Sequence, residues 1–283
     1  MKQNTIILLL CAVPFISGCS LYRKYEPKAL EYDAATMVKA DSTESPLCSL
    51  SWRELFTDSC LTVLIDSGLT RNADLRIAQF KVNEAAATLK ASKLAFLPSL
   101  NVNAEGSVSK DNPNKFQIAP TASWELDIFG KQHNLKKGAE ADFYGSEAYR
   151  QAVQTSLIAT IAEGYYTLLM LDEQLNISER TVKTWDENIR VLQALKRAGR
   201  TNEAAVLQAR ANRMKVENSA LTLKNQIFAQ ENALRSLLLD PDIDIARNKF
   251  EHQVFPDTLS AGLALGLLSN RPDVREAEFA LQR

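Results

Sequence analysis

Residues Phe116–Gly130 read FQIAPTASWELDIFG and carry the most informative pattern in the chain. Up to residue 128, apolar side chains occupy the even positions, and polar or small side chains occupy the odd ones. Residues 100–109, LNVNAEGSVS, alternate in the same way, and the turn-rich segment KDNPN at 110–114 joins the two runs. Alternation with a period of two residues is typical of strands that have one apolar and one polar face. The sequence therefore predicts a β-hairpin within residues 98–130.

This hairpin has the length and the patterning of a transmembrane β-hairpin. A membrane-spanning strand needs about nine to eleven tilted residues, apolar toward lipid and polar toward the lumen. In this interpretation Trp124 and Phe129 belong to an aromatic girdle. Glu125 and Asp127 are expected about 7 Å apart on one face of the strand, where they line a water-filled lumen. The alternative is an ordinary half-buried hairpin that packs on the helices.

A single hairpin cannot close a barrel in lipid. Every backbone N–H and C=O must be paired there, so a sheet crosses the membrane only as a closed barrel. One hairpin supplies two strands, whereas single-chain bacterial barrels begin at about eight. We therefore expect several chains to contribute strands to one shared barrel.

The rest of the chain is predominantly helical. Residues 61–97 predict one helix that Pro98 ends. Residues 138–239 predict a long αα-hairpin, with helices over about 146–198 and 202–239, and residues 240–261 predict a connector. The first of these helices has apolar residues at sustained heptad spacing, which indicates coiled-coil packing: Ile161, Leu168, Leu175, Val182 and Ile189. The second has two apolar stripes, so we expect it to pack on more than one neighbour.

The N-terminus resembles a lipoprotein leader. Lys2 precedes an apolar run of signal-peptide length, and small residues come directly before Cys19. We therefore predict a signal peptide over residues 1–18, lipidation of Cys19, and a lipid-anchored tether over residues 19–60; a plain secretory signal is the alternative. Cys48 and Cys60 would then lie in a compartment where they can form a disulfide or remain two thiols.

Two distant segments match in register. Residues 69–80 read LTRNADLRIAQF, and residues 268–279 read LSNRPDVREAEF. The pattern predicts an internal repeat, although two amphipathic helix starts can also resemble each other by chance. We expect residues 262–283 to begin a second copy and the chain to be a fragment of a protein about twice the length of the repeat.

Composition and motifs give no sign of catalysis or of nucleic-acid binding. The 33 basic and 34 acidic residues balance to a net charge of −1, so no basic surface is indicated. His133 and His252 have no metal-ligand spacing, and no phosphate-binding or nucleophile motif is present. We therefore expect no catalytic residue, metal or cofactor. An envelope hydrolase that uses Glu125 and Asp127 for acid–base chemistry is an alternative.

Several short motifs occur along the chain in a distinctive order: ISGC (16–19), WRELF (52–56), NADLR (72–76), FLPSL (96–100), WELDIFG (124–130), SLLL (236–239) and RPDVREAE (271–278). Their order and spacing resemble the outer-membrane efflux factor family, the TolC-like channels. The resemblance is to the lipoprotein branch that serves resistance–nodulation–division (RND) pumps. The resemblance implies a homotrimer that builds an α-helical coiled-coil barrel in the periplasm and a transmembrane β-barrel in the outer membrane.

The resemblance also implies a function and a site. The protein would be a passive conduit that exports small molecules, together with a periplasmic adaptor and an inner-membrane RND pump. The family's adaptor-contacting tip falls on Gly199, Arg200, Thr201 and Asn202, where Arg200 and Asn202 depart from the commoner pattern. The alternative from another class is a periplasmic coiled-coil lipoprotein that acts as a scaffold and forms no pore.

Overall fold

The computed structural model describes residues 51–108, 115–253 and 271–283. Its elements follow in the order α2 (Trp52–Leu55), α3 (Ser59–Arg71), α4 (Ala73–Leu94), β1 (Ser99–Ser107), β2 (Lys115–Ser123), α5 (Lys131–Arg197), α6 (Glu203–Leu238), the 3-10 helix η4 (Phe250–His252) and α8 (Pro272–Gln282). The predicted signal peptide, Cys19, Cys48 and the hairpin turn at 110–114 lie outside the described residues.

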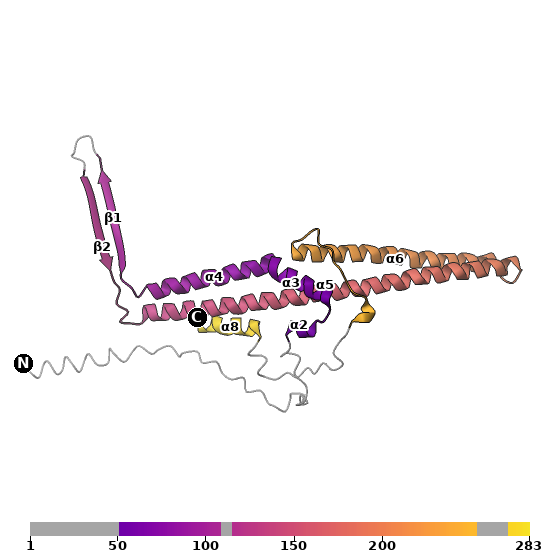
Figure 1. Ribbon diagram of the computed structural model, residues 1–283, viewed down its shortest axis with the longest axis horizontal. Coiled ribbons are helices and arrows are strands. Elements are labelled where there is room, and N and C mark those ends of the chain that lie inside the picture. Colours follow the sequence, from indigo (N-terminus) through magenta and orange to yellow (C-terminus); the bar gives the residue numbers. More distant parts are fainter. Residues whose placement is uncertain (1–50, 109–114, 254–270) are drawn as a thin grey trace, which may run out of the picture.

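Helix α5 is the axis of the molecule (Figure 1). Its 67 residues form a rod about 100 Å long at a rise of 1.5 Å per residue. Helix α6 runs back along the C-terminal half of α5, whereas α4 and α8 lie along its N-terminal half. The β-hairpin projects from the end at which α5 begins, so the sheet and the tip of the αα-hairpin lie at opposite ends. Over the described residues, the prediction of a mainly helical chain with one β-hairpin is confirmed.

The apolar core lies where α3 meets the α5–α6 pair. The largest side chains of this core are completely or almost completely buried: Leu61, Ile65, Ile161, Tyr165, Leu168, Leu169 and Leu238. Two of the heptad positions, Ile161 and Leu168, are fully buried. Gly164 lies between them, and a Cβ built on it would come within 2.8 Å of Leu234 Cδ2 on α6. The absence of a side chain at this position lets α5 and α6 approach closely.

The single helix predicted over residues 61–97 is in fact two helices, α3 and α4. Asn72 lies between the two helices, and its ψ of 133° is not helical. Its side chain accepts a hydrogen bond from the backbone N–H of Leu75 and donates one to the carbonyl of Leu237 at the end of α6. Asn72 is therefore the N-cap of α4, and it ties this helix start to the core.

Helix α5 begins at Lys131, which is earlier than the sequence analysis expected. Gly138 lies inside the helix and does not end or start it. Gly130, with φ +72°, is the N-cap residue, and the carboxylate of Asp127 accepts hydrogen bonds from the first backbone N–H groups of the helix. These groups have no partner inside the helix, so a nearby carboxylate fixes where the helix starts.

The two matching segments of the sequence begin helices at equivalent places. Helix α4 starts at Ala73 after Asn72, and α8 starts at Pro272 after Arg271. Proline is well suited to the first position of a helix, because its missing N–H has no partner there in any case. Both helices pack along α5. None of the helices in the described ranges is both long and apolar enough to cross a membrane.

Candidate functional sites: the β-hairpin, the helical tip and the connector

The register of the β-hairpin separates apolar from polar side chains. Apolar or small residues face each other in the pairs Leu100–Ala122, Val102–Pro120, Ala104–Ile118 and Gly106–Phe116. The intervening pairs are mostly polar: Asn101–Thr121, Asn103–Ala119, Glu105–Gln117 and Ser107–Lys115. Paired residues in an antiparallel sheet point to the same side, so the hairpin has one apolar and one largely polar face.

Both faces of the hairpin are open. Leu100 is 78% exposed and Phe116 77% exposed, and the strands project away from the helices (Figure 1). A two-stranded hairpin with an uncovered apolar face is marginally stable at best in water. The apolar face therefore requires another surface or another solvent. The alternative of a hairpin half-buried against the chain's own helices is wrong.

Glu125 and Asp127 do not share a strand face, which corrects the sequence analysis. Strand β2 ends at Ser123, and both acids lie in the junction that leads to α5. Asp127 accepts hydrogen bonds from the backbone N–H groups of Gln132 (3.0 Å) and His133 (2.8 Å). Glu125 forms an ion pair with Lys131 at 3.1 Å. Both carboxylates bind the start of α5, so each negative charge has a structural partner and needs no acid–base role to explain it.

Trp124 also belongs to this junction and not to the strand. Its indole Nε1–H donates to the carbonyl of Phe96, which precedes β1, at 3.1 Å. This bond closes the base of the hairpin, while the indole ring remains largely exposed. Phe129 is exposed as well. The two aromatic residues thus lie at the base of the hairpin, where they could face the edge of a bilayer; their membership of an aromatic girdle stays a prediction.

The predicted tip residues form the turn between α5 and α6. Gly199 has φ +67°, and no atom lies within 4 Å of the place where its Cβ would be. The N–H of Arg200 donates to the carbonyl of Leu195, and the side chain of Asn202 accepts from Ala205 N–H as the N-cap of α6. The turn is therefore ordered, and its backbone is open to close approach from outside.

The connector after α6 is held by a buried carboxylate that sequence reasoning missed. Asp58, only 9% exposed, accepts from Tyr165 Oη (2.7 Å), Cys60 N–H (2.8 Å), Asn248 Nδ2 (2.9 Å) and Gln253 Nε2 (2.7 Å). We call these five residues the Asp58 cluster. The only local signal was an Asp at a helix start, which is typical of an N-cap.

Burial and hydrogen bonding act in opposite directions on Asp58. Burial disfavours its charged form, but the hydrogen bonds from Tyr165, Gln253, Cys60 and Asn248 together outweigh it and lower the pKa of the carboxyl. The pKa of Tyr165 is raised, mainly by burial and further by its bond to the Asp58 carboxylate. Asp58 is therefore ionised and Tyr165 protonated at neutral pH, as their hydrogen bond requires.

A second set of contacts binds the connector to the αα-hairpin. Arg247 forms ion pairs with Asp172 on α5 (2.6 Å) and with Glu231 on α6 (2.7 Å). Arg235 donates to the connector carbonyl of Ile243 at 3.2 Å. Because Arg247 bridges both helices, this contact holds the connector across the αα-hairpin next to the Asp58 cluster.

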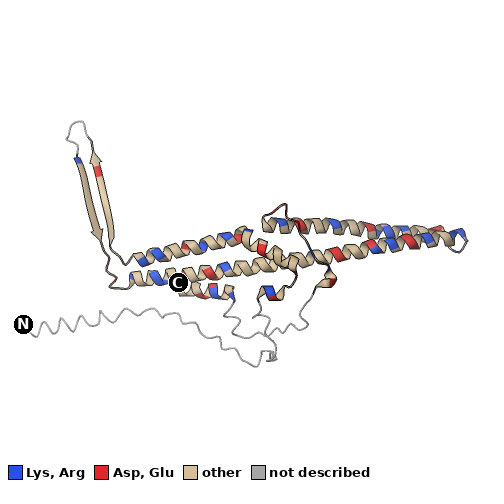
Figure 2. Cartoon of the chain, in the orientation of Figure 1, with Lys and Arg blue, Asp and Glu red and all other residues tan. Residues whose placement is uncertain are grey.

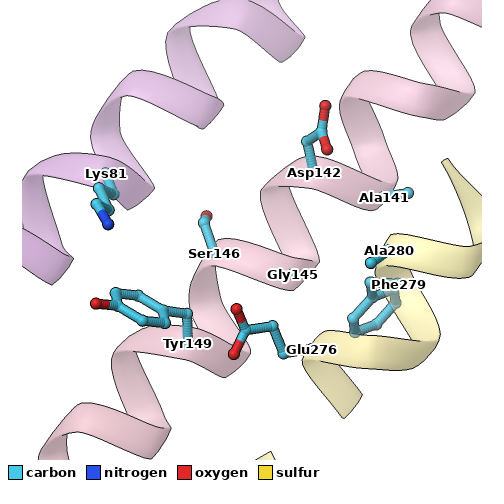
Figure 3. A pocket seen from close by; sticks show the side chains of 9 residues that line it. All are labelled: Lys81, Ala141, Asp142, Gly145, Ser146, Tyr149, Glu276, Phe279 and Ala280. Carbon is cyan, nitrogen blue, oxygen red and sulfur yellow. The ribbon is translucent and has the colours of Figure 1, made fainter. Parts of the chain in front are cut away.

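A surface pocket of about 270 Å³ lies between α4, α5 and α8 (Figure 3). Lys81 from α4 reaches over the ring of Tyr149, 4.6 Å from its centroid, and Glu276 and Phe279 of α8 form the other side. Phe279 lies beside Gly145, and a Cβ built on Gly145 would lie 3.5 Å from the Cβ of Phe279. The pocket is the gap left where three helices pack together. Within the described part of the chain, no group of three or more His, Cys, Asp or Glu residues could hold a metal ion.

An exposed two-faced β-hairpin on one end of a long αα-hairpin is the architecture of a TolC-like outer-membrane channel subunit. The outer membrane efflux protein family matches residues 64–238, and the chain belongs to this family. It is 27% identical over 288 residues to the cation efflux system protein CusC of Escherichia coli K12, covering 97% of this chain and 62% of CusC. It is 28% identical over 239 residues to the probable outer membrane lipoprotein SilC of Salmonella typhimurium, covering 82% of this chain and 52% of SilC.

The solved structures agree with this assignment. The outer-membrane channel OprN superimposes with a TM-score of 0.77 and 25% identity, covering 92% of this chain and 61% of OprN. The chain therefore spans between about half and two thirds of the length of the relatives named here. The TolC-like fold predicted from the sequence is confirmed over the matched part.

Proposed function

We propose that this chain forms part of the outer-membrane channel subunit of a tripartite efflux system. The subunit acts as a passive conduit for small molecules across the outer membrane and has no enzymatic activity. The observation that carries the proposal is the register of the hairpin, which places its apolar residues on one exposed face. Lipid can cover such a face, and water can fill the space beside the polar face.

The hairpin alone cannot complete a barrel. It leaves unpaired edge groups on both strands, and these must be paired within the hydrocarbon region. We propose that strands from three copies of the subunit close the barrel as a homotrimer. Lipidation of Cys19 would add an anchor in the outer membrane, and the likeness to the lipoprotein SilC supports this assignment.

The helical rod supports the periplasmic part of the proposal. It extends about 100 Å from the hairpin to the tip at Gly199–Asn202, so the tip lies far from the outer membrane. We propose that the tip contacts a periplasmic adaptor, which joins the channel to an inner-membrane RND pump. A conduit of this kind has little with which to select its cargo, so the choice of substrate belongs to the pump.

Conductance across a planar lipid bilayer tests the proposal. The purified full-length protein should migrate as a heat-sensitive trimer on gels and give stable single-channel conductance steps. Replacing Val102 on the apolar face with lysine should abolish these steps, whereas the same change at its polar neighbour Asn103 should preserve them. A folded trimer that never conducts would contradict the conduit and favour the non-pore scaffold.

A further inference from the structure

Basic side chains gather at the tip of the αα-hairpin. Residues 190–210 contain five basic residues and one acidic residue, all of them exposed: Arg190, Lys196, Arg197, Arg200, Arg210 and Glu203. Figure 2 shows the Lys and Arg residues on both helices close to the turn. The whole chain has nearly equal numbers of basic and acidic residues, so this excess is local.

Two ion pairs connect the two helices below the tip. Arg213 on α6 binds Asp186 on α5 at 2.6 Å, and Lys224 on α6 binds Glu179 on α5 at 2.9 Å. In each pair, the charge of a basic residue on α6 is balanced by an acidic residue on α5. The same arrangement would be available at the tip, but the sequence supplies only one acid there.

That acid is already used by one lysine. Glu203 forms an ion pair with Lys196, and this contact, together with the charge of Arg210, lowers the pKa of Glu203. Among the described residues, the ion pairs include no acidic partner for Arg197 or Arg200. Arg197 can also interact favourably with the C-terminal end of α5, but Arg200 lies in the turn, beyond that helix. A helix-end role therefore leaves the charge of Arg200 unexplained.

The turn that presents these charges has a fixed shape. Gly199 adopts a left-handed conformation, and Asn202 caps α6, so the backbone between them is ordered. The space around Gly199 is open, which allows the backbone of another chain to approach. Exposed apolar side chains, Val191 and Leu207, flank the basic residues. An ordered turn with apolar neighbours favours a protein partner over a lipid headgroup surface.

We infer that the tip binds an acidic protein surface, in which Asp or Glu side chains of the periplasmic adaptor pair with Arg197 and Arg200. This inference rests on the proposed function, which supplies the adaptor as the partner. Complementary charges across such a contact speed association and exclude partners of the wrong sign, so the basic tip would restrict which adaptors the channel accepts.

Binding of the full-length protein to the purified adaptor of the same efflux system tests the inference. The Arg197→Glu/Arg200→Glu variant should bind about ten-fold or more weakly at low salt, and the difference should shrink as salt is added. The control is Lys90→Glu/Lys93→Glu, the same charge change on exposed residues of α4 near the β-hairpin. It should bind like the unchanged protein. The single variant Arg200→Glu changes no helical residue. Weaker adaptor binding by this variant therefore cannot be ascribed to a damaged helix.

Three further results would decide the matter. Exchange of the adaptor's acidic residues for lysine should restore binding to the Arg197→Glu/Arg200→Glu variant. Equal adaptor binding by the variant and the unchanged protein would overturn the inference. The inference would also be overturned if the variant kept its binding to the adaptor and lost only binding to phosphatidylglycerol vesicles, because the basic residues would then bind lipid. Conductance of the unchanged protein and of the α4 control, measured in parallel, reports separately on the proposed conduit.

Discussion

The hydroxyl of Tyr165 donates a 2.7 Å hydrogen bond to the buried carboxylate of Asp58, although the two residues are 107 positions apart. Asp58 also caps the start of α3, and Tyr165 lies in the middle of α5. The backbone N–H of Asn248, in the connector, donates to the same Tyr165 oxygen at 3.1 Å. The two hydrogen bonds on the Tyr165 hydroxyl therefore join the start of α3, the central helix α5 and the connector.

Replacing Tyr165 with phenylalanine should destabilise the protein by about 1–3 kcal/mol. The change keeps the ring but removes the donor to Asp58 and the acceptor of the Asn248 N–H, leaving buried polar groups without a partner. The midpoint of thermal unfolding, followed by circular dichroism of the full-length protein in detergent, measures the effect. The exposed Thr222→Val change removes only a hydroxyl that bonds to its own helix and serves as the control. Equal midpoints for the two variants would contradict a structural role for the Asp58 cluster.

The Asp58 cluster should also make stability depend on acid pH. Because the pKa of Asp58 is lowered in the folded state, its contribution is fully present above the ordinary carboxyl pKa near 4 and is lost as the pH falls through the lower folded value. Asp58→Asn removes this titration. The variant should be less stable than the unchanged protein at neutral pH, and this difference in stability should narrow as the pH falls from about 5 to about 2. Denaturant midpoints over this range measure the difference, and a difference that stays constant would contradict the assignment.

Two glycines of α5 offer a matched test of helix packing. A Cβ at Gly164 would lie 2.8 Å from Leu234 Cδ2, whereas one at Gly145 would lie 3.5 Å from its nearest neighbour, Phe279 Cβ. Alanine raises helix propensity equally at both positions, so this gain cancels in the comparison. We expect Gly164→Ala to be less stable than Gly145→Ala by about 1–3 kcal/mol, because Leu234 has to move in a packed core. Thermal midpoints of the two variants provide the measurement. If Gly164→Ala were at least as stable as Gly145→Ala, the packing of α5 against α6 would have room for the added methyl group.

Local patterns predicted the local features of this fold. The two-residue alternation predicted both faces of the hairpin, because the direction of a strand side chain depends only on its position in the strand. The same alternation misled us about where β2 ends. Trp124 and Asp127 continue the pattern, but Trp124 binds Phe96 at the base of the hairpin and Asp127 caps α5. The needs of the following helix, not of the strand, place these residues.

No local sequence pattern indicated the contacts between distant segments. The partners of Asp58 lie up to 195 positions away in the sequence, and their identity depends on how the connector crosses α5. Asn72 likewise breaks the first helical segment by binding the carbonyl of Leu237, 165 positions later. The helical content of the region was predictable from composition, whereas the break depends on tertiary structure.

Replacing Asp127 with alanine should weaken the start of α5. The carboxylate accepts from two backbone N–H groups that have no partner within the helix, so its loss should cost about 0.5–2 kcal/mol. Hydrogen exchange of the amides of Gln132 and His133 should become faster, while the tip amides near Asn202 remain unchanged. The neighbouring Glu125→Gln variant tests specificity, since Glu125 binds only the side chains of Lys131 and Gln132 and no backbone N–H of the helix start. Unchanged exchange at Gln132 would show that Asp127 is available for a role in the lumen.

The apolar face of the hairpin gives the most direct prediction about the membrane. Val102 and Asn103 are adjacent residues near the middle of β1, but they belong to opposite faces. In a lipid-exposed barrel, lysine at Val102 would place a charge in hydrocarbon and cost about 2–4 kcal/mol per chain, whereas lysine at Asn103 would face water. A trimer pays this cost three times, so Val102→Lys should fail to assemble in the outer membrane while Asn103→Lys still does. The fraction of heat-sensitive trimer recovered from outer membranes measures assembly. If both variants assembled equally well, neither face of the hairpin could be in contact with lipid, and the hairpin would have to pack against protein.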